Sequence, residues 1–219
     1  MMRYVVFDLD ETLGYFTQVY VLCIKFESIM NCKLTTNNLL ELYKEFELIF
    51  RPGLMVLMAY VKVLKETKNV KIVLYTNTTM KMVWVKCLLL YIDQKIHSST
   101  KLFDIIIGLE SECRTTIKKT KKDILRCISG ATPDSKILVI DDKLHKELIH
   151  DNTIYHEIDN YVYYYNNNDI WQYIHKVANK KCTVNVTKNK LPETLNVMKK
   201  ERSRKEIMAL IHKLKEFMR

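Results

Sequence analysis

The chain has 219 residues, of which 48% are hydrophobic and 27% are charged, and this length and balance suit one α/β domain with a substantial core. No apolar stretch is long enough to span a membrane and the first residues do not read as a signal peptide, so we expect a soluble intracellular protein, nuclear or cytoplasmic. The net charge of +10 is uneven, because residues 180–219 contribute +8 and the first 179 residues only +2.

The first predicted element is a buried strand. The short apolar run Tyr4-Val5-Val6-Phe7 is β-prone, and polar residues begin directly after it, at Asp8. Residues 15–34 mix apolar and polar side chains and suit either a small flap or the beginning of a helix. Thr35 to Asn38 then provides a helix cap, and apolar residues follow at helical spacing as far as Ile49.

Strands and helices alternate along the rest of the main domain. Pro52 suits the first turn of a helix that runs to about Glu66. Further strands are predicted over residues 70–75, 103–107, 136–140 and 153–158, and further helices over 80–92, 119–128 and 169–177. Residues 163–168 contain three tyrosines followed by three asparagines. We expect a strand followed by an Asn-rich turn here, in preference to a nucleic-acid site in which the tyrosines stack on bases. This alternation predicts a doubly wound α/β fold, with a parallel sheet and right-handed crossovers.

The basic C-terminal part is predicted to be separate from the main domain. We assign residues 1–179 to the α/β domain and residues 180–219 to a tail. Within that tail an amphipathic basic helix is predicted from apolar residues at helical spacing, namely Ile207, Leu210, Ile211, Leu214 and Phe217. Such a helix can pack on its own domain, on a partner helix or on a membrane surface, and its charge suits nucleic acid or an acidic protein.

The six cysteines are scattered and form no C-x-x-C pair. They are Cys23, Cys32, Cys87, Cys113, Cys127 and Cys182. In an intracellular protein this spacing favours reduced thiols over a disulfide framework or a zinc site.

Polar residues end three of the predicted strands, and most of them are carboxylates. In parallel sheets the carboxyl ends of the strands form the usual ligand-binding edge. Asp8 and Asp10 follow the first strand, Thr76 follows the second, and Asp141 and Asp142 follow a later one. Four carboxylates at one edge require a counter-charge, and Mg²⁺ commonly joins such carboxylates to a phosphate.

These residue types fit the transfer of a phosphoryl group. Asp8 can attack phosphorus and form an aspartyl-phosphate, and Asp10 can protonate the leaving oxygen and later activate water. Thr76 can hydrogen-bond a phosphoryl oxygen, and a lysine can neutralise charge in the transition state.

The order of these motifs resembles the haloacid dehalogenase (HAD) superfamily. Within it, four segments look like the phosphatases of the RNA polymerase II C-terminal domain and the NLI-interacting-factor-like small phosphatases. They are F-D-L-D-E-T-L (7–13), R-P-G-L (51–54), L-Y-T-N (74–77) and K-D-I-L (122–125). The resemblance covers about residues 3–178 and implies an HAD-like fold with at most a small cap.

The resemblance also implies roles for individual residues. Asp8 would be the nucleophile and Asp10 the acid/base. Asp8, Asp10, Asp141 and Asp142 would form the Mg²⁺ site, with Asp10 contributing its backbone carbonyl. Phosphate binding would fall to Thr76, Asn77 and Lys122, where Lys122 is chosen among Lys118, Lys119, Lys121 and Lys122 for its match to K-D-I-L.

The sequence leaves three functions open. The segments between the motifs are too short for a large lid, and an open site suits a phosphate carried on a large molecule. A phosphoserine or phosphothreonine protein is therefore the expected substrate of a magnesium-dependent phosphatase. The alternatives are a phosphatase of nucleic-acid 3′ ends and a non-catalytic adaptor on the same fold, although an adaptor would be expected to have lost Asp8 or Asp10. For Arg51, a surface position ahead of a helix is favoured over contact with an anionic substrate.

Overall fold

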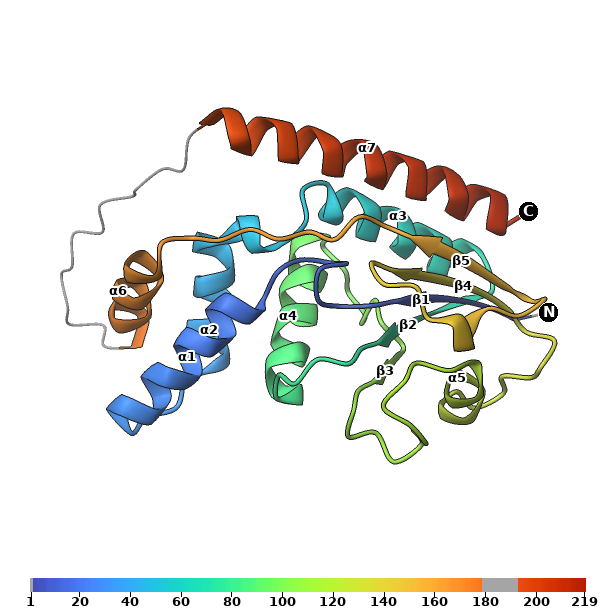
Figure 1. Ribbon diagram of the computed structural model, residues 1–219, viewed down its shortest axis with the longest axis horizontal. Coiled ribbons are helices and arrows are strands. Elements are labelled where there is room, and N and C mark those ends of the chain that lie inside the picture. The colour runs from blue at the N-terminus through green and yellow to red at the C-terminus, as the bar shows by residue number, and fades with distance from the viewer. Residues whose placement is uncertain (1, 179–192) are drawn as a thin grey trace.

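A five-stranded, all-parallel sheet forms the centre of the protein (Figure 1). The computed structural model describes residues 2–178 and 193–219. The strands lie in the order β3-β2-β1-β4-β5. In chain order they are β1 (Arg3–Phe7), β2 (Val70–Tyr75), β3 (Ile105–Ile107), β4 (Lys136–Asp141) and β5 (Thr153–Glu157). The predicted α/β fold with a parallel sheet is therefore confirmed.

Helices connect these strands and cover the sheet. They are α1 (Thr17–Met30), α2 (Thr36–Glu45), α3 (Leu54–Thr67), α4 (Met82–Lys95), α5 (Lys121–Cys127), α6 (Asn167–Ala178) and α7 (Glu193–Phe217), with short 3-10 helices η1 (Glu47–Ile49) and η2 (Lys146–Leu148). Two N-termini are capped as their sequences suggest. Thr35 and Asn38 form a reciprocal capping box at α2, and the Thr120 hydroxyl accepts from the Asp123 N–H at α5.

Alternating residues of the strands pack into two separate apolar clusters. Val5 and Phe7 of β1 join the large cluster on one face, together with residues of α3, α4 and α7. Tyr4 and Val6 join a smaller cluster on the opposite face, with Ile124 of α5. Because successive strand residues point to opposite faces, this split produces a three-layer arrangement with the sheet in the middle.

Three local expectations are settled by the backbone. Residues 17–30 form a helix and not a flap, and α1 and α2 pack against α6 and α4. Pro52 precedes the N-cap residue Gly53, so it lies just outside α3 and not in its first turn. The strand predicted near Tyr163 is wrong: residues 158–166 run as an extended segment without a sheet partner, and α6 begins at Asn167.

The C-terminal helix packs on the main domain along α3 (Figure 1). Ile207, Leu210, Ile211, Leu214 and Phe217 are all buried in the large apolar cluster. The amphipathic helix is therefore confirmed over the described part of the tail. It packs on α3 of its own domain. None of the helices in residues 2–178 and 193–219 has the length and apolar character needed to cross a membrane.

The expectation of reduced cysteines is wrong for one pair. Cys113 and Cys127 form a disulfide with a Cα–Cα distance of 5.0 Å. Cys23, Cys32 and Cys87 are free thiols, and Cys182 lies outside the described residues. Sequence spacing did not reveal the pair because β3 and α5 bring together two residues that are 14 positions apart.

Candidate active site at the carboxyl edge of the sheet

The polar ends of β1, β2 and β4 meet at one edge of the sheet. In the parallel register Phe7 lies beside Leu74 on one side and Ile140 on the other, so the chain leaves all three strands at the same level. The Asp8 N–H donates to the Ile140 carbonyl at 2.9 Å, which continues the ladder by one residue. Asp8, Asp141 and Asp142 are consequently gathered, with one carboxylate oxygen of each within 4.8 Å of the others.

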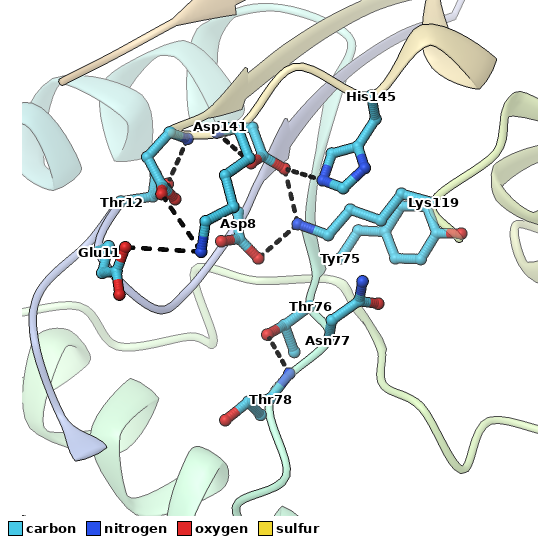
Figure 2. A network of polar contacts seen from close by, with 12 residues as sticks. Asp8, Glu11, Thr12, Tyr75, Thr76, Asn77, Thr78, Lys119, Asp141 and His145 are labelled. Atoms are coloured by element: carbon cyan, nitrogen blue, oxygen red, sulfur yellow. Dashed lines mark hydrogen bonds and ion pairs between the residues drawn. The ribbon is translucent and has the colours of Figure 1, made fainter. Parts of the chain in front are cut away.

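A buried lysine bridges two of these carboxylates. Lys119 Nζ lies 2.5 Å from Asp8 Oδ1 and 2.6 Å from Asp141 Oδ2 (Figure 2). Lys119 is 2% exposed and Asp141 is 1% exposed, so this pairing is shielded from water. Because the strength of a charge interaction rises as water is excluded, Lys119 is the main protein cation that offsets the two carboxylates.

The structure brings Lys119, and not Lys122, to the carboxylates. Lys122 is exposed on α5, and the residue at the carboxylates is Lys119, just before the helix. The residue after Lys122, Asp123, is buried and faces inward. Its carboxylate accepts from the N–H and hydroxyl of Thr115 and from the Tyr75 hydroxyl, which leaves Lys122 on the outside.

Asp10 and Asp142 each have a buried carboxylate oxygen that accepts no hydrogen bond from the described residues. Asp142 Oδ1 accepts from the Thr12 hydroxyl at 2.9 Å, whereas Asp142 Oδ2 and Asp10 Oδ1 are buried without a hydrogen-bond donor among the described residues. Lys143 Nζ lies 3.8 Å from Asp142 Oδ2, at the outer limit of an ion pair. A buried carboxylate oxygen without a partner is costly unless a cation binds it. The chemistry of this oxygen set therefore fits a hard divalent cation such as Mg²⁺.

Burial shifts the titration of both N-terminal carboxylates. Burial raises the pKa of Asp8 to about 7, although the charge of Lys119 opposes the rise. Burial also raises the pKa of Asp10, while a hydrogen bond from Thr78 lowers it. A raised pKa suits a group that must hold a proton and deliver it, as Asp10 would. For Asp8, a bound cation would act in the same direction as Lys119 and favour the carboxylate.

Thr76 and Asn77 lie where β2 ends, as the sequence predicted. Thr76 is fully buried, and its hydroxyl accepts from the Thr78 N–H at 3.0 Å. Arg114 braces this strand end from the loop after β3: its guanidinium donates to the Thr76 carbonyl at 3.1 Å and to the Asn77 side-chain oxygen. Arg114 also lies over the Tyr75 ring, with the guanidinium carbon 4.9 Å from the ring centroid.

The predicted site residues did not include Thr12, Arg114, Lys143 or His145. Thr12 ties the β1 and β4 ends together, because it donates to the Asp142 carboxylate and accepts from the Asp142 N–H. His145 Nε2 lies 3.6 Å from Asp141 Oδ2 (Figure 2). Thr12 was signalled by its place in the D-x-D-E-T motif. His145 and Arg114 follow no motif, and only the folded loops bring them to the strand ends.

Comparison of the chain with protein-family models, curated proteins and solved structures finds no match. The site combines a strand-end carboxylate, a second carboxyl group with a raised pKa, a buried lysine and two carboxylate oxygens without a hydrogen bond from the described residues. These are the kinds of group that phosphoryl transfer uses.

Proposed function

We propose that the protein is a magnesium-dependent phosphatase of the haloacid dehalogenase type that works through an aspartyl-phosphate. The observation that carries this proposal is the bridge from Lys119 to Asp8 and Asp141 at the strand ends. A lysine held against a strand-end carboxylate is placed to neutralise a phosphoryl group that becomes attached to that carboxylate.

The residues divide the reaction between them. Asp8 Oδ attacks phosphorus, the bond to the leaving oxygen breaks, and Asp10 supplies the proton to that oxygen. Asp10 then takes a proton from water, which attacks the phosphorus of the aspartyl-phosphate and releases phosphate and the Asp8 carboxylate. Thr76, Asn77 and Lys119 would hold the phosphoryl oxygens, with Lys119 in the role that the sequence had given to Lys122.

A magnesium ion would be held by Asp8, Asp141 and Asp142, with Asp10 nearby. Its part would be to offset the carboxylate charges and the charge of the phosphoryl group. The Asp142 side chain is already oriented for such an ion, because its Oδ1 accepts a hydrogen bond from the Thr12 hydroxyl.

We further propose a phosphoserine or phosphothreonine protein as the substrate. Between Thr76 and Lys119 the chain forms only α4, the short strand β3 and a loop. The helices α1 and α2, inserted between the first motif and α3, pack against α6 and α4. A site with little chain available to close over it suits a phosphate presented by a large molecule.

The charge of α7 favours phosphorylated nucleic-acid ends as a second candidate. Exposed basic residues line its described part, including Arg202, Arg204, Lys205 and Lys215. Such a face can contact a phosphate backbone, and binding would then weaken with added salt.

The test compares wild type with Asp8→Asn on p-nitrophenyl phosphate, phosphoserine heptad peptides and 3′-phosphorylated DNA, with and without Mg²⁺. We expect hydrolysis of the first two substrates by wild type with Mg²⁺, and loss of activity in Asp8→Asn, because an amide cannot serve as the nucleophile. Activity retained in Asp8→Asn, or unaffected by removal of Mg²⁺, would contradict the proposal. Hydrolysis of DNA ends but not of peptides would select the second candidate.

A further inference from the structure

Arg51 is buried beneath the loop that carries Asp10. It is 2% exposed, so the expected surface position is wrong. Its Nε donates to the Thr12 carbonyl at 2.7 Å and its Nη2 to the Glu11 carbonyl at 2.6 Å. Nη2 also donates to the Asp159 carbonyl at 2.5 Å, and Nη1 binds the Glu206 carboxylate at 2.8 Å. One guanidinium thus joins the loop after β1 to two segments from the C-terminal part of the chain.

The backbone that Arg51 holds is the part of the first motif directly after Asp10. Glu11 has a φ of 63°, in the left-handed region that costs energy for a residue with a side chain. Its conformation is held by several bonds, since the Tyr161 N–H also donates to the Glu11 carbonyl at 2.8 Å. Release of these bonds would let Glu11 relax, and the turn of the backbone at Asp10 would change with it.

The other end of this loop is packed tightly against the segment that leads to Arg51. A Cβ on Gly14 would lie 2.3 Å from the Ile49 carbonyl oxygen, and the Tyr15 N–H donates to that same oxygen at 2.7 Å. The Arg51 N–H donates to the Leu13 carbonyl at 3.0 Å. A shift of Arg51 is therefore transmitted to the whole loop, because little free space separates the two segments.

The C-terminal helix supplies the counter-charge of Arg51. A buried guanidinium is costly without a carboxylate partner. Among the described residues, Glu206 of α7 is the carboxylate within ion-pair distance of Arg51. The next residue, Ile207, is 2% exposed and packs over Gly53, where a Cβ would lie 3.4 Å from the Ile207 Cβ. Figure 1 shows α7 lying along α3, which begins three residues after Arg51.

We propose that Arg51 is a positioning residue for Asp10 and that α7, through Glu206, is part of the support of the active site. The kinetic consequence rests on the proposed phosphatase function. The structural consequence, a loop after β1 whose order depends on a charge in the C-terminal helix, rests on the geometry alone.

The test replaces Glu206 with Gln, which keeps the size and one oxygen but removes the charge. The matched control is Glu201→Gln, an exposed glutamate on the same helix. Burial and a hydrogen bond shared with Asp159 raise the pKa of Glu206 to about 7, although the charges of Arg51 and Arg202 oppose the rise. Measurements at pH 8 therefore compare a charged Glu206 with a neutral Gln.

Amide hydrogen exchange gives a readout that does not depend on activity. We expect faster exchange in peptides covering residues 8–14 of Glu206→Gln and of Arg51→Lys, because the loop loses bonds that hold it closed. Peptides covering β4 should keep wild-type exchange. Glu201→Gln should match wild type in both regions.

The kinetic arm uses p-nitrophenyl phosphate and Mg²⁺. We expect kcat to fall about 10- to 100-fold in Glu206→Gln and Arg51→Lys with KM within twofold of wild type, since a displaced Asp10 affects proton transfer more than binding. Wild-type exchange in residues 8–14 of both variants would overturn the positioning role. Equal acceleration in β4 and the loop would also overturn it, because Arg51 would then support the fold in general. A wild type without phosphatase activity would contradict the proposed function, and the exchange arm would still decide the role of Arg51.

Discussion

Lys119 is the residue on which the proposed chemistry depends most directly. Its ammonium group contacts Asp8 and Asp141 at once, and all three side chains are almost completely buried. A methionine at this position would leave two adjacent carboxylates without their protein cation, and a phosphoryl group on Asp8 would lose its stabilising charge.

We predict that Lys119→Met lowers kcat/KM on p-nitrophenyl phosphate by about 100-fold or more. Lys122→Met should stay within about twofold of wild type, because surface charges contribute little. Steady-state kinetics at a fixed Mg²⁺ concentration would decide between the two lysines. A larger loss in Lys122→Met than in Lys119→Met would restore the assignment that the K-D-I-L motif suggested.

The carboxylates of the site could be predicted from the sequence, and the groups around them could not. Recognisable apolar runs precede Asp8, Asp10, Asp141 and Asp142. A parallel sheet brings the ends of such strands together, independently of the conformation of the loops. Lys119 and Arg51 depend on loop geometry. Lys119 and Lys122 are three positions apart, and the burial of Asp123 decides which of them faces the site.

At the scale of elements, the disulfide closes the segment that carries Arg114 and Lys119 to the site. Cys113 precedes Arg114, and Cys127 is the last residue of α5. Between them the Thr120 N–H and the Asp123 carboxylate both bind the Tyr75 hydroxyl, which attaches the segment to the end of β2. The disulfide and Tyr75 thus restrain the same segment at different points.

We predict that reduction of the Cys113–Cys127 bond lowers stability. Closure of a loop of this length is worth about 3 kcal/mol in the chain-entropy model. Dithiothreitol should therefore lower the Tm of wild type but not that of a Cys113→Ser/Cys127→Ser variant. The control is Cys32→Ser, which removes an exposed free thiol and should respond to dithiothreitol as wild type does. Equal Tm values for oxidised and reduced wild type, with the bond verified by mass spectrometry, would contradict the prediction.

The order of strands and helices was more predictable than their connections. Apolar runs of strand length alternate with helical periodicity, so β1, β2 and β4 were expected close to their observed bounds. The α1 segment was ambiguous because its apolar residues do not follow one helical face, and the packing against α6 decides its conformation. The tyrosines near Tyr163 have strand propensity, yet the segment is extended without joining the sheet.

At the scale of the whole molecule, α7 and the sheet share one apolar cluster. The division of the sequence into residues 1–179 and a tail was based on the uneven distribution of charge. Among the described side chains of α7, the charged ones lie mainly on its outer face. The inner face of α7 is as apolar as a core helix, with Leu210 and Leu214 fully buried. We therefore expect α7 and the α/β domain to unfold together in one cooperative transition.

Leu210→Ala tests this expectation, with Met208→Ala as its control on the same helix. Leu210 is 0% exposed and Met208 is 61% exposed, so only the first substitution creates a cavity in the shared cluster. We expect Leu210→Ala to lower the free energy of unfolding by about 2–5 kcal/mol, and Met208→Ala by no more than about 0.5 kcal/mol. Urea unfolding followed by tryptophan fluorescence reports on the main domain, because Trp84 and Trp171 lie in α4 and α6. If Leu210→Ala left that transition unchanged, the helix would be an independent appendage, and its contact with Arg51 could not support the active site.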